Sequence, residues 1–359
     1  MPRYLLGLAL IFSLNILAQP VLFKRLSTPP LQYSCPKIPD GSITIDGKPN
    51  EDHWQKAEWT TLFQDIEGKD LPTPTYATKA KILWDNHALY VAAHLEEPHL
   101  WATLKNHDDI IFHDNDFEVF ISGDPTDVEY YEIEVNTFNT IFDLLLPKPY
   151  RDLGKPNIPW NVHGLVTAVQ INGTLNNPSD IDESWTVEMK IPFTGLSLQQ
   201  TGKAPSAGDA WRINFSRVQY DLVIHKTIYE KKRDAVSGKT LPEKNWVWSP
   251  QGIIDMHFPE RWGYLLFQDD KTKTTFTPGI DEKLEDALWL IYYVQRENFK
   301  STRNYLEKLP EFTASLNEVF NNPDFRINLN LTKKSWNATI KHIPSGTVRS
   351  LDQSGILNQ

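Results

Sequence analysis

Asn115-Asp116-Phe117-Glu118-Val119-Phe120 joins two turn-forming residues to an alternating apolar strand, and this arrangement decides the fold class. The same arrangement occurs twice earlier in the chain. Ile45-Asp46-Gly47 precedes Trp54, and Leu83-Trp84-Asp85 precedes Leu89-Tyr90-Val91. Each stretch places a polar or aromatic group at the end of a strand, as antiparallel β-sandwiches do.

A period of two in apolar residues recurs along most of the chain. The clearest alternating segments are residues 89–95, 117–121, 130–137, 185–191 and 211–216. Clusters of Gly, Pro and Asn separate them, which is typical of half-buried antiparallel strands. A parallel α/β sheet needs helices between its strands, so the pattern excludes that class. We therefore predict a mainly β protein, an antiparallel β-sandwich of jelly-roll-like topology over residues 38–268. Residues 49–57 are expected to form a short helix.

The C-terminal part has a different pattern. An apolar stripe at helical spacing runs from Asp281 to about Leu309, with acidic residues in its first turn. Residues 325–331 alternate again and predict a strand. We expect a small helix-plus-strand unit over residues 276–345, whose helix could bind a protein partner, and a disordered tail from about Ser345.

Charge and cysteine content exclude several classes of protein. The 359 residues have a formal net charge of -10 and a pI of about 5.5. A sequence-independent nucleic-acid-binding protein needs a basic face, so we expect no nucleic-acid partner. Cys35 is the only cysteine, so no internal disulfide can form, and the core or metal ions must stabilise the fold.

The N-terminal residues resemble a secretory signal. Arg3 precedes an apolar run over residues 4–14, and Leu17-Ala18-Gln19 offers a small residue at a cleavage site. We expect residues 1–19 to be a signal peptide and the protein to be exported to the periplasm, the cell surface or the medium. An uncleaved anchor is the alternative, and no later stretch is long and apolar enough to cross a bilayer.

Taken in order, these motifs resemble the family 9 carbohydrate-binding modules, and in particular their bacterial family 9-like branch. Later stretches extend the likeness to residues 38–267; they are Asp182-Glu183-Ser184-Trp185, Ile191-Pro192-Phe193, Gly208-Asp209-Ala210-Trp211, Trp246-Val247-Trp248-Ser249-Pro250 and Phe258-Pro259-Glu260-Arg261-Trp262-Gly263. The resemblance implies a β-sandwich, often stabilised by calcium, that binds carbohydrate without cleaving it and acts beside polysaccharide-degrading enzymes.

The resemblance also implies a binding site. In the family, a sugar lies between two Trp rings, while a Glu, an Arg and an Asn bond its hydroxyls. These positions fall here on Phe112 and Glu118, on Glu134 in place of the Arg, on Asn136, and on Met256 or His257 with Trp262 close by. The residues themselves add Trp160, which lies between a Pro and an Asn and is expected to be an exposed stacking platform. Trp248 is expected in the core.

Two acidic loops are candidate calcium sites. Their aspartates are Asp108, Asp109, Asp114, Asp116, Asp180 and Asp182. Calcium takes several oxygen ligands in loose geometry, and neither loop has the spacing of a helix-loop-helix calcium site. The alternative is that these are solvated turn residues bonding the local backbone.

Other functions stay open at this point. Glu118 and Glu134 lie on the polar faces of two strands that could pair, and two close carboxylates can cleave a glycosidic bond or hold a cation. His107 and His113, which flank Asp108 and Asp109, and His257 beside Met256 leave open a transition-metal or haem site. A surface-assembly protein that has lost sugar binding and uses its C-terminal helix is a third alternative.

Overall fold

The computed structural model describes Arg25 and residues 28–123, 129–196, 204–273, 275–308 and 324–358. They fall into two compact units, one spanning Pro30–Phe276 and the other containing Thr277–Gln359. The predicted signal peptide, residues 1–19, lies outside the described residues. In the described part of the chain, no helix has the length and apolarity of a membrane span.

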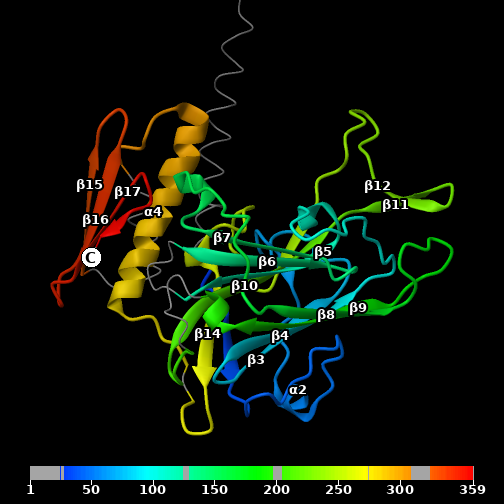
Figure 1. The fold of residues 1–359 in the computed structure, drawn as a ribbon. Helices are drawn as coiled ribbons and strands as arrows, with labels where there is room; N and C mark the ends of the chain where they lie inside the picture. The colour runs from blue at the N-terminus through cyan, green and yellow to red at the C-terminus, as the bar shows by residue number, and fades with distance from the viewer. Residues whose placement is uncertain are drawn as a thin grey trace, which may run out of the picture. The chain divides into compact units, whose positions relative to one another are not determined.

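The first unit is built from two main sheets (Figure 1). The large sheet has the spatial order β1 (Gln32–Pro36), β14 (Gly263–Gln268), β10 (Ala210–Gln219), β5 (Asp116–Ser122), β6 (Tyr130–Asn136) and β7 (Ile141–Leu146), and β13 (Lys244–Val247) and β2 (Gln64–Asp65) extend it from β10. The small sheet has the order β3 (Thr78–Trp84), β4 (Ala88–Glu96), β9 (Ser184–Pro192) and β8 (Val166–Asn172). A separate hairpin joins β11 (Leu222–His225) to β12 (Ile228–Lys231). Apart from the parallel β1–β14 pair, the named strand pairs are antiparallel, which confirms the predicted β-sandwich.

The hydrophobic core lies between the two sheets. The inward residues of β5 and β6 are Phe117, Val119, Ile121, Tyr131, Ile133 and Val135, and they share one buried cluster with Leu89, Val91, Ala93, Val187, Met189 and Ile191 of β4 and β9. Trp248 belongs to this cluster and is 2% exposed, as predicted. Burial on this scale of aliphatic and aromatic area holds the two layers together.

A buried carboxylate explains the motif Ile45-Asp46-Gly47 with Trp54. Glu188 on β9 accepts hydrogen bonds from the backbone N–H of Asp46 (3.1 Å) and Gly47 (2.8 Å) and from the indole Nε1 of Trp54 (2.8 Å). Trp54 lies on α2 (Asp52–Lys56), which confirms the predicted short helix. Gly47 has φ +85°, and a Cβ there would lie 2.8 Å from the backbone of Gln170, so only glycine fits. The motif is a joint between the N-terminal loop and the small sheet.

The motif Leu83-Trp84-Asp85 with Leu89-Tyr90-Val91 forms a turn between two strands. Asp85 follows β3, and its Oδ1 accepts the backbone N–H groups of His87 (2.7 Å) and Ala88 (2.8 Å), where β4 begins. Its Oδ2 accepts the hydroxyl of Tyr90 at 2.8 Å. An aspartate that bonds the backbone two and three residues ahead fixes a tight turn, so Asp85 sets the register of the β3–β4 hairpin.

A buried ion pair links the two sheets. Arg217 on β10 donates to Glu97, which follows β4, at 2.9 Å, and to the hydroxyl of Thr78 on β3 at 3.0 Å. Both charged side chains are at most 2% exposed. Loss of either partner would leave a buried charge unpaired.

The second unit combines one helix with a four-stranded sheet. α4 (Ile280–Thr302) begins where predicted and ends before the predicted Leu309, because Arg303 adopts a left-handed conformation with φ 60°. The antiparallel sheet contains β15 (Phe325–Leu331), β16 (Trp336–His342), β17 (Val348–Asp352) and β18 (Leu357–Asn358). The predicted disordered tail after Ser345 is therefore wrong. β17 has two apolar residues, Val348 and Leu351, and only Leu351 is buried, so its sequence carries little strand signal.

Candidate functional site: a carboxylate-lined pocket on the large sheet

The outer face of the large sheet carries acidic side chains. Glu118 and Phe120 on β5 and Glu132 and Glu134 on β6 point away from the core, because side chains alternate along a strand. In the register of the two strands Glu118 lies directly opposite Glu134, and Phe120 lies opposite Glu132. The close approach of these two glutamates, predicted from their alternation, is confirmed. Like charges opposite each other destabilise a sheet, so this arrangement has a cost for the fold.

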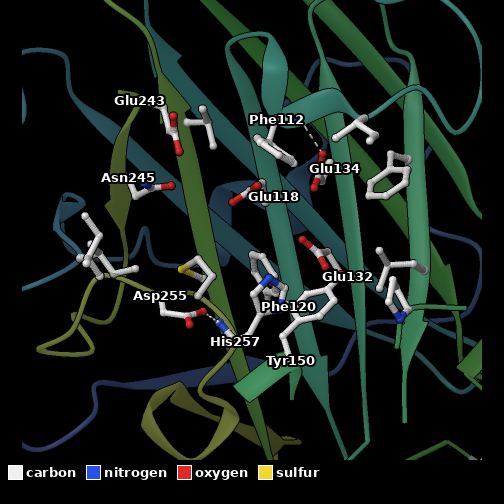
Figure 2. A pocket seen from close by; sticks show the side chains of 18 of the residues that line it. Phe112, Glu118, Phe120, Glu132, Glu134, Tyr150, Glu243, Asn245, Asp255 and His257 are labelled. Carbon is white, nitrogen blue, oxygen red and sulfur yellow. Dashed lines mark hydrogen bonds between the residues drawn. The ribbon is translucent and has the colours of Figure 1, made fainter. Parts of the chain in front are cut away.

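Loops before β5, after β7 and around β13 enclose a cavity of about 610 Å³ over this face. Its acidic lining residues are Glu118, Glu132, Glu134, Glu243 and Asp255, and its aromatic ones are Phe112, Phe120, Phe142, Tyr150 and His257. Figure 2 shows Glu118 between Phe112 and Tyr150, with Glu243 and Asp255 on one side and Glu132 and Glu134 on the other. The residues Phe112 and Tyr150 are 36% and 41% exposed, so both are available for stacking on a ligand.

Burial and mutual repulsion raise the pKa values of the central carboxyl groups. The pKa of Glu118 rises from 4.5 to about 7, because of burial and the charge of Glu243. That of Glu132 rises from 4.5 to about 8, because of burial and the charges of Glu118 and Asp255. Burial, together with Glu118 and Glu132, also raises the pKa of Glu134 well above its usual value. The pocket thus retains protons near neutral pH unless a positive charge enters it.

Two buried carboxylate oxygens beside the pocket have no hydrogen-bond partner in the geometry of the described residues, and neither has Oγ of Ser216, which lies opposite Glu118 on β10. The two carboxylate oxygens are Oε2 of Glu118, a residue that is 4% exposed, and Oδ2 of Asp116, which is fully buried. Glu134 uses its Oε2 to accept the backbone N–H of Phe112 at 2.8 Å. Asp116, Glu118 and Glu134 can each offer one oxygen atom such that all three lie within 4.8 Å of one another. Unpaired buried acceptors are costly, so these oxygens favour a bound proton or a donor from a ligand.

His257 closes the lower end of the pocket as a neutral side chain. Its Nδ1 lies 2.8 Å from the hydroxyl of Tyr130, and its ring contacts Tyr150 edge-on at 4.5 Å between ring centroids. Burial lowers the pKa of His257 to about 4. Arg151 donates to the His257 carbonyl (3.1 Å) and to the Glu260 carboxylate (2.9 Å). His257 therefore adds an aromatic surface but no charge near neutral pH.

The structure brings together five of the eight residues predicted to bind sugar. Phe112, Glu118, Glu134, Met256 and His257 all line the pocket. Asn136 does not line it; it is buried and donates to the carbonyl of Leu104 and the carboxylate of Asp114.

Neither predicted tryptophan lines the pocket. Trp262 is fully buried under it, and its Nε1 donates to the Met256 carbonyl at 2.8 Å. Trp160 is only partly buried, and its ring packs on Tyr131 at 5.1 Å, against the core between the sheets.

Sequence reasoning missed several pocket residues. Glu132 was detectable, because it alternates with Glu134 on the same strand. Tyr150, Glu243 and Asp255 come from loops far apart in the sequence, and no local pattern brings them to the sheet. Only the tertiary fold assembles them.

The six aspartates of the two predicted calcium loops have different surroundings. Asp109 is half-buried and accepts backbone N–H groups of its own turn, as in the alternative interpretation. Asp114 and Asp182 are buried and accept backbone N–H groups from neighbouring segments. Asp180 is exposed on its loop. Asp108 lies close to His107 and Asp143, with one ligand atom from each within 4.8 Å of the others, while Asp116 belongs to the pocket group. Calcium binding stays a prediction.

Comparison with known proteins identifies the domain. Residues 45–223 match the family described as carbohydrate family 9 binding domain-like. The chain carries a domain of this family. Among solved structures, the family 9-like domain is similar to a proposed carbohydrate-binding protein from Bacteroides uniformis ATCC 8492, with 17% identity and a TM-score of 0.50 over 67% of this chain and 100% of that chain.

A second similar structure is a family 9 carbohydrate-binding module from Caldicellulosiruptor kristjanssonii in complex with cellotriose. It has 16% identity and a TM-score of 0.39, over 69% of this chain and 100% of that chain. No curated protein matches. At this identity the Bacteroides structure supports the β-sandwich fold, and the site must be judged on its own residues.

Proposed function

We propose that the pocket on the large sheet binds a saccharide without cleaving it, and that the protein is exported and acts in the recognition or breakdown of polysaccharide. The observation that carries this proposal is the cavity of about 610 Å³ with exposed aromatic rings around buried carboxylates. That volume lies within the range of small-molecule sites. Membership of a carbohydrate-binding family and the apolar N-terminal run support the proposal.

Each part of the pocket has a role in this function. Phe112 and Tyr150 are exposed aromatic residues at opposite ends of the pocket in Figure 2, with Glu118 and Phe120 between them. Each can stack on the C–H face of a sugar ring, the role of the two Trp rings in the family. Tyr150 then takes the place of the second ring, which the sequence assigns to Met256, His257 or Trp262. Carboxylates such as Glu118 can accept hydrogen bonds from sugar hydroxyls, and bonds to charged acceptors are stronger than neutral ones.

Isothermal titration of the full chain against a set of neutral and charged oligosaccharides tests the proposal. We expect binding to at least one of them, with affinity lowered about tenfold or more in Tyr150→Ala, because one stacking face is lost. Glu58→Gln, at an exposed position outside the pocket, is the matched control. Failure of every saccharide to bind the folded protein would disprove the proposal.

A glycoside hydrolase is the second candidate. A buried glutamate with a pKa of about 7 beside another carboxyl group is a suitable general acid, and Glu118 has this environment. Reducing-sugar release that is abolished in Glu118→Gln would establish the hydrolase, and binding without release would support the proposed function.

A further inference from the structure

The charge of the pocket indicates the class of saccharide, an inference that rests on the proposed function. Five carboxylate residues line the cavity, and the described residues that line it include no lysine or arginine. His257 does not compensate, because burial keeps it neutral near pH 7. A neutral sugar can form hydrogen bonds with these carboxyl groups, but it brings no positive charge that would stabilise their ionised form.

Two basic side chains close in sequence or space to the pocket residues, Arg151 and Lys231, have other partners. Arg151 is paired with Asp152 and Glu260, at 3.2 and 2.9 Å. Lys231 holds its Nζ 3.6 Å from the ring centroid of Tyr220. The charged groups that shift the pKa values of Glu132 and Glu134 are themselves carboxyl groups. Charge balance in the pocket therefore depends on protons or on a ligand.

The positions of the acceptor atoms suit a shared cationic donor. Oxygens of Asp116, Glu118 and Glu134 lie within 4.8 Å of one another, and Oε2 of Glu118 has no hydrogen-bond partner. The tetrahedral N–H donors of one ammonium nitrogen, with N···O distances of about 2.8–2.9 Å, reach two oxygens roughly 4.6–4.7 Å apart, close to the upper limit of the spacing here. An ammonium group also offers three donors.

We propose that the ligand is an amino sugar whose protonated amine contacts Glu118 and Glu134 while its ring lies between Phe112 and Tyr150. The room above the carboxylates favours an organic cation over a bare metal ion, because a cavity of about 610 Å³ with two exposed rings far exceeds what an ion needs. Aromatic faces also attract the carbon-bound ammonium groups of such ligands.

Three disaccharides with the same β-1,4 backbone test this inference by titration calorimetry of the full chain in EDTA. They are the glucosamine dimer, N,N′-diacetylchitobiose and cellobiose. We expect the glucosamine dimer to bind at least about tenfold more tightly than the other two, because a charge-assisted hydrogen bond replaces a neutral one. The preference should shrink to less than about threefold in Glu118→Gln and persist in Glu58→Gln.

Glu243→Gln, at the rim of the pocket, is a second variant if Glu118→Gln does not fold, and it should weaken the preference in the same direction. Equal or tighter binding of cellobiose would overturn the inference and leave the proposed function standing. A preference that survives both substitutions, or binding that needs added Ca²⁺, would also overturn it. Failure of all three disaccharides and of every other saccharide would disprove the proposed function as well.

Discussion

Replacing Glu132 by glutamine should raise the free energy of unfolding above that of the wild type. The difference between the two proteins should grow as the pH rises. Glu132 is 5% exposed, and burial with the charges of Glu118 and Asp255 raises its pKa from 4.5 to about 8. A carboxyl group with a raised pKa stays protonated in the folded state after the unfolded chain has released its proton. Its contribution to stability is therefore present below about pH 4.5 and is lost as the pH rises towards 8.

The size of the effect follows from this pKa. One extra proton bound by the folded state lowers the free energy of unfolding by about 1.4 kcal/mol per pH unit. Between about pH 5 and pH 8 the loss from Glu132 amounts to about 4 kcal/mol. Glutamine is also neutral, nearly isosteric and able to accept a hydrogen bond. Glu132→Gln should therefore match the wild type near pH 5 and exceed it by up to about 4 kcal/mol near pH 8.

Urea unfolding followed by tryptophan fluorescence at about pH 5, 6, 7 and 8 measures this difference. The C-terminal unit is the same in each protein, so its contribution cancels in the comparison. Glu58→Gln, an exposed substitution, should reproduce the wild-type curve. Parallel curves for Glu132→Gln and the wild type would show that Glu132 is not held protonated, and would refute the electrostatic account of the pocket.

Three further predictions concern named contacts. Glu188→Ala should lower the free energy of unfolding by about 3 kcal/mol or more, because Trp54 Nε1 and two backbone N–H donors lose a buried acceptor. Trp54→Phe should lower it by less. Equal losses for the two variants in urea unfolding would contradict this prediction. Arg217→Ala should lower the free energy of unfolding by about 3–5 kcal/mol, because Glu97 is left buried without its ion-pair partner. The double variant with Glu97→Ala should recover part of that free energy. Additive losses in urea unfolding would show that the two residues are not coupled. Tyr150→Phe should bind saccharide far better than Tyr150→Ala in calorimetry, because the ring and not the hydroxyl does the stacking.

The fold could be predicted where alternation is strong. Phe117, Val119 and Ile121 point into the core as their spacing indicates, and the same spacing places Glu118 opposite Glu134 once β5 and β6 pair. Period-two patterns contain this information because alternate side chains of a strand point to opposite faces of the sheet, one apolar and one acidic here. The apolar residues of β17 do not alternate strongly, so the sequence did not predict this strand.

Contacts between distant segments could not be predicted from the sequence. Trp54 is recognisable as part of a motif, yet its partner Glu188 lies 134 residues away. Trp160 and Trp262 are candidates by residue type, but a tryptophan that fills a core and one that stacks on a ligand look the same in a sequence. Tyr150 supplies the second exposed ring because a loop after β7 brings it there, and loop conformation has no periodic signal.

The acidic face of the large sheet connects stability with binding. A sheet built only for stability would not place Glu118 opposite Glu134 with Glu132 beside them, because each buried charge weakens the fold. A ligand that brings a positive charge removes this cost only when it is bound, so the repulsion in the free protein becomes part of the affinity for the ligand. Stability and binding should therefore change in opposite directions: Glu132→Gln should be the more stable protein near pH 8 and the weaker binder of a cationic saccharide.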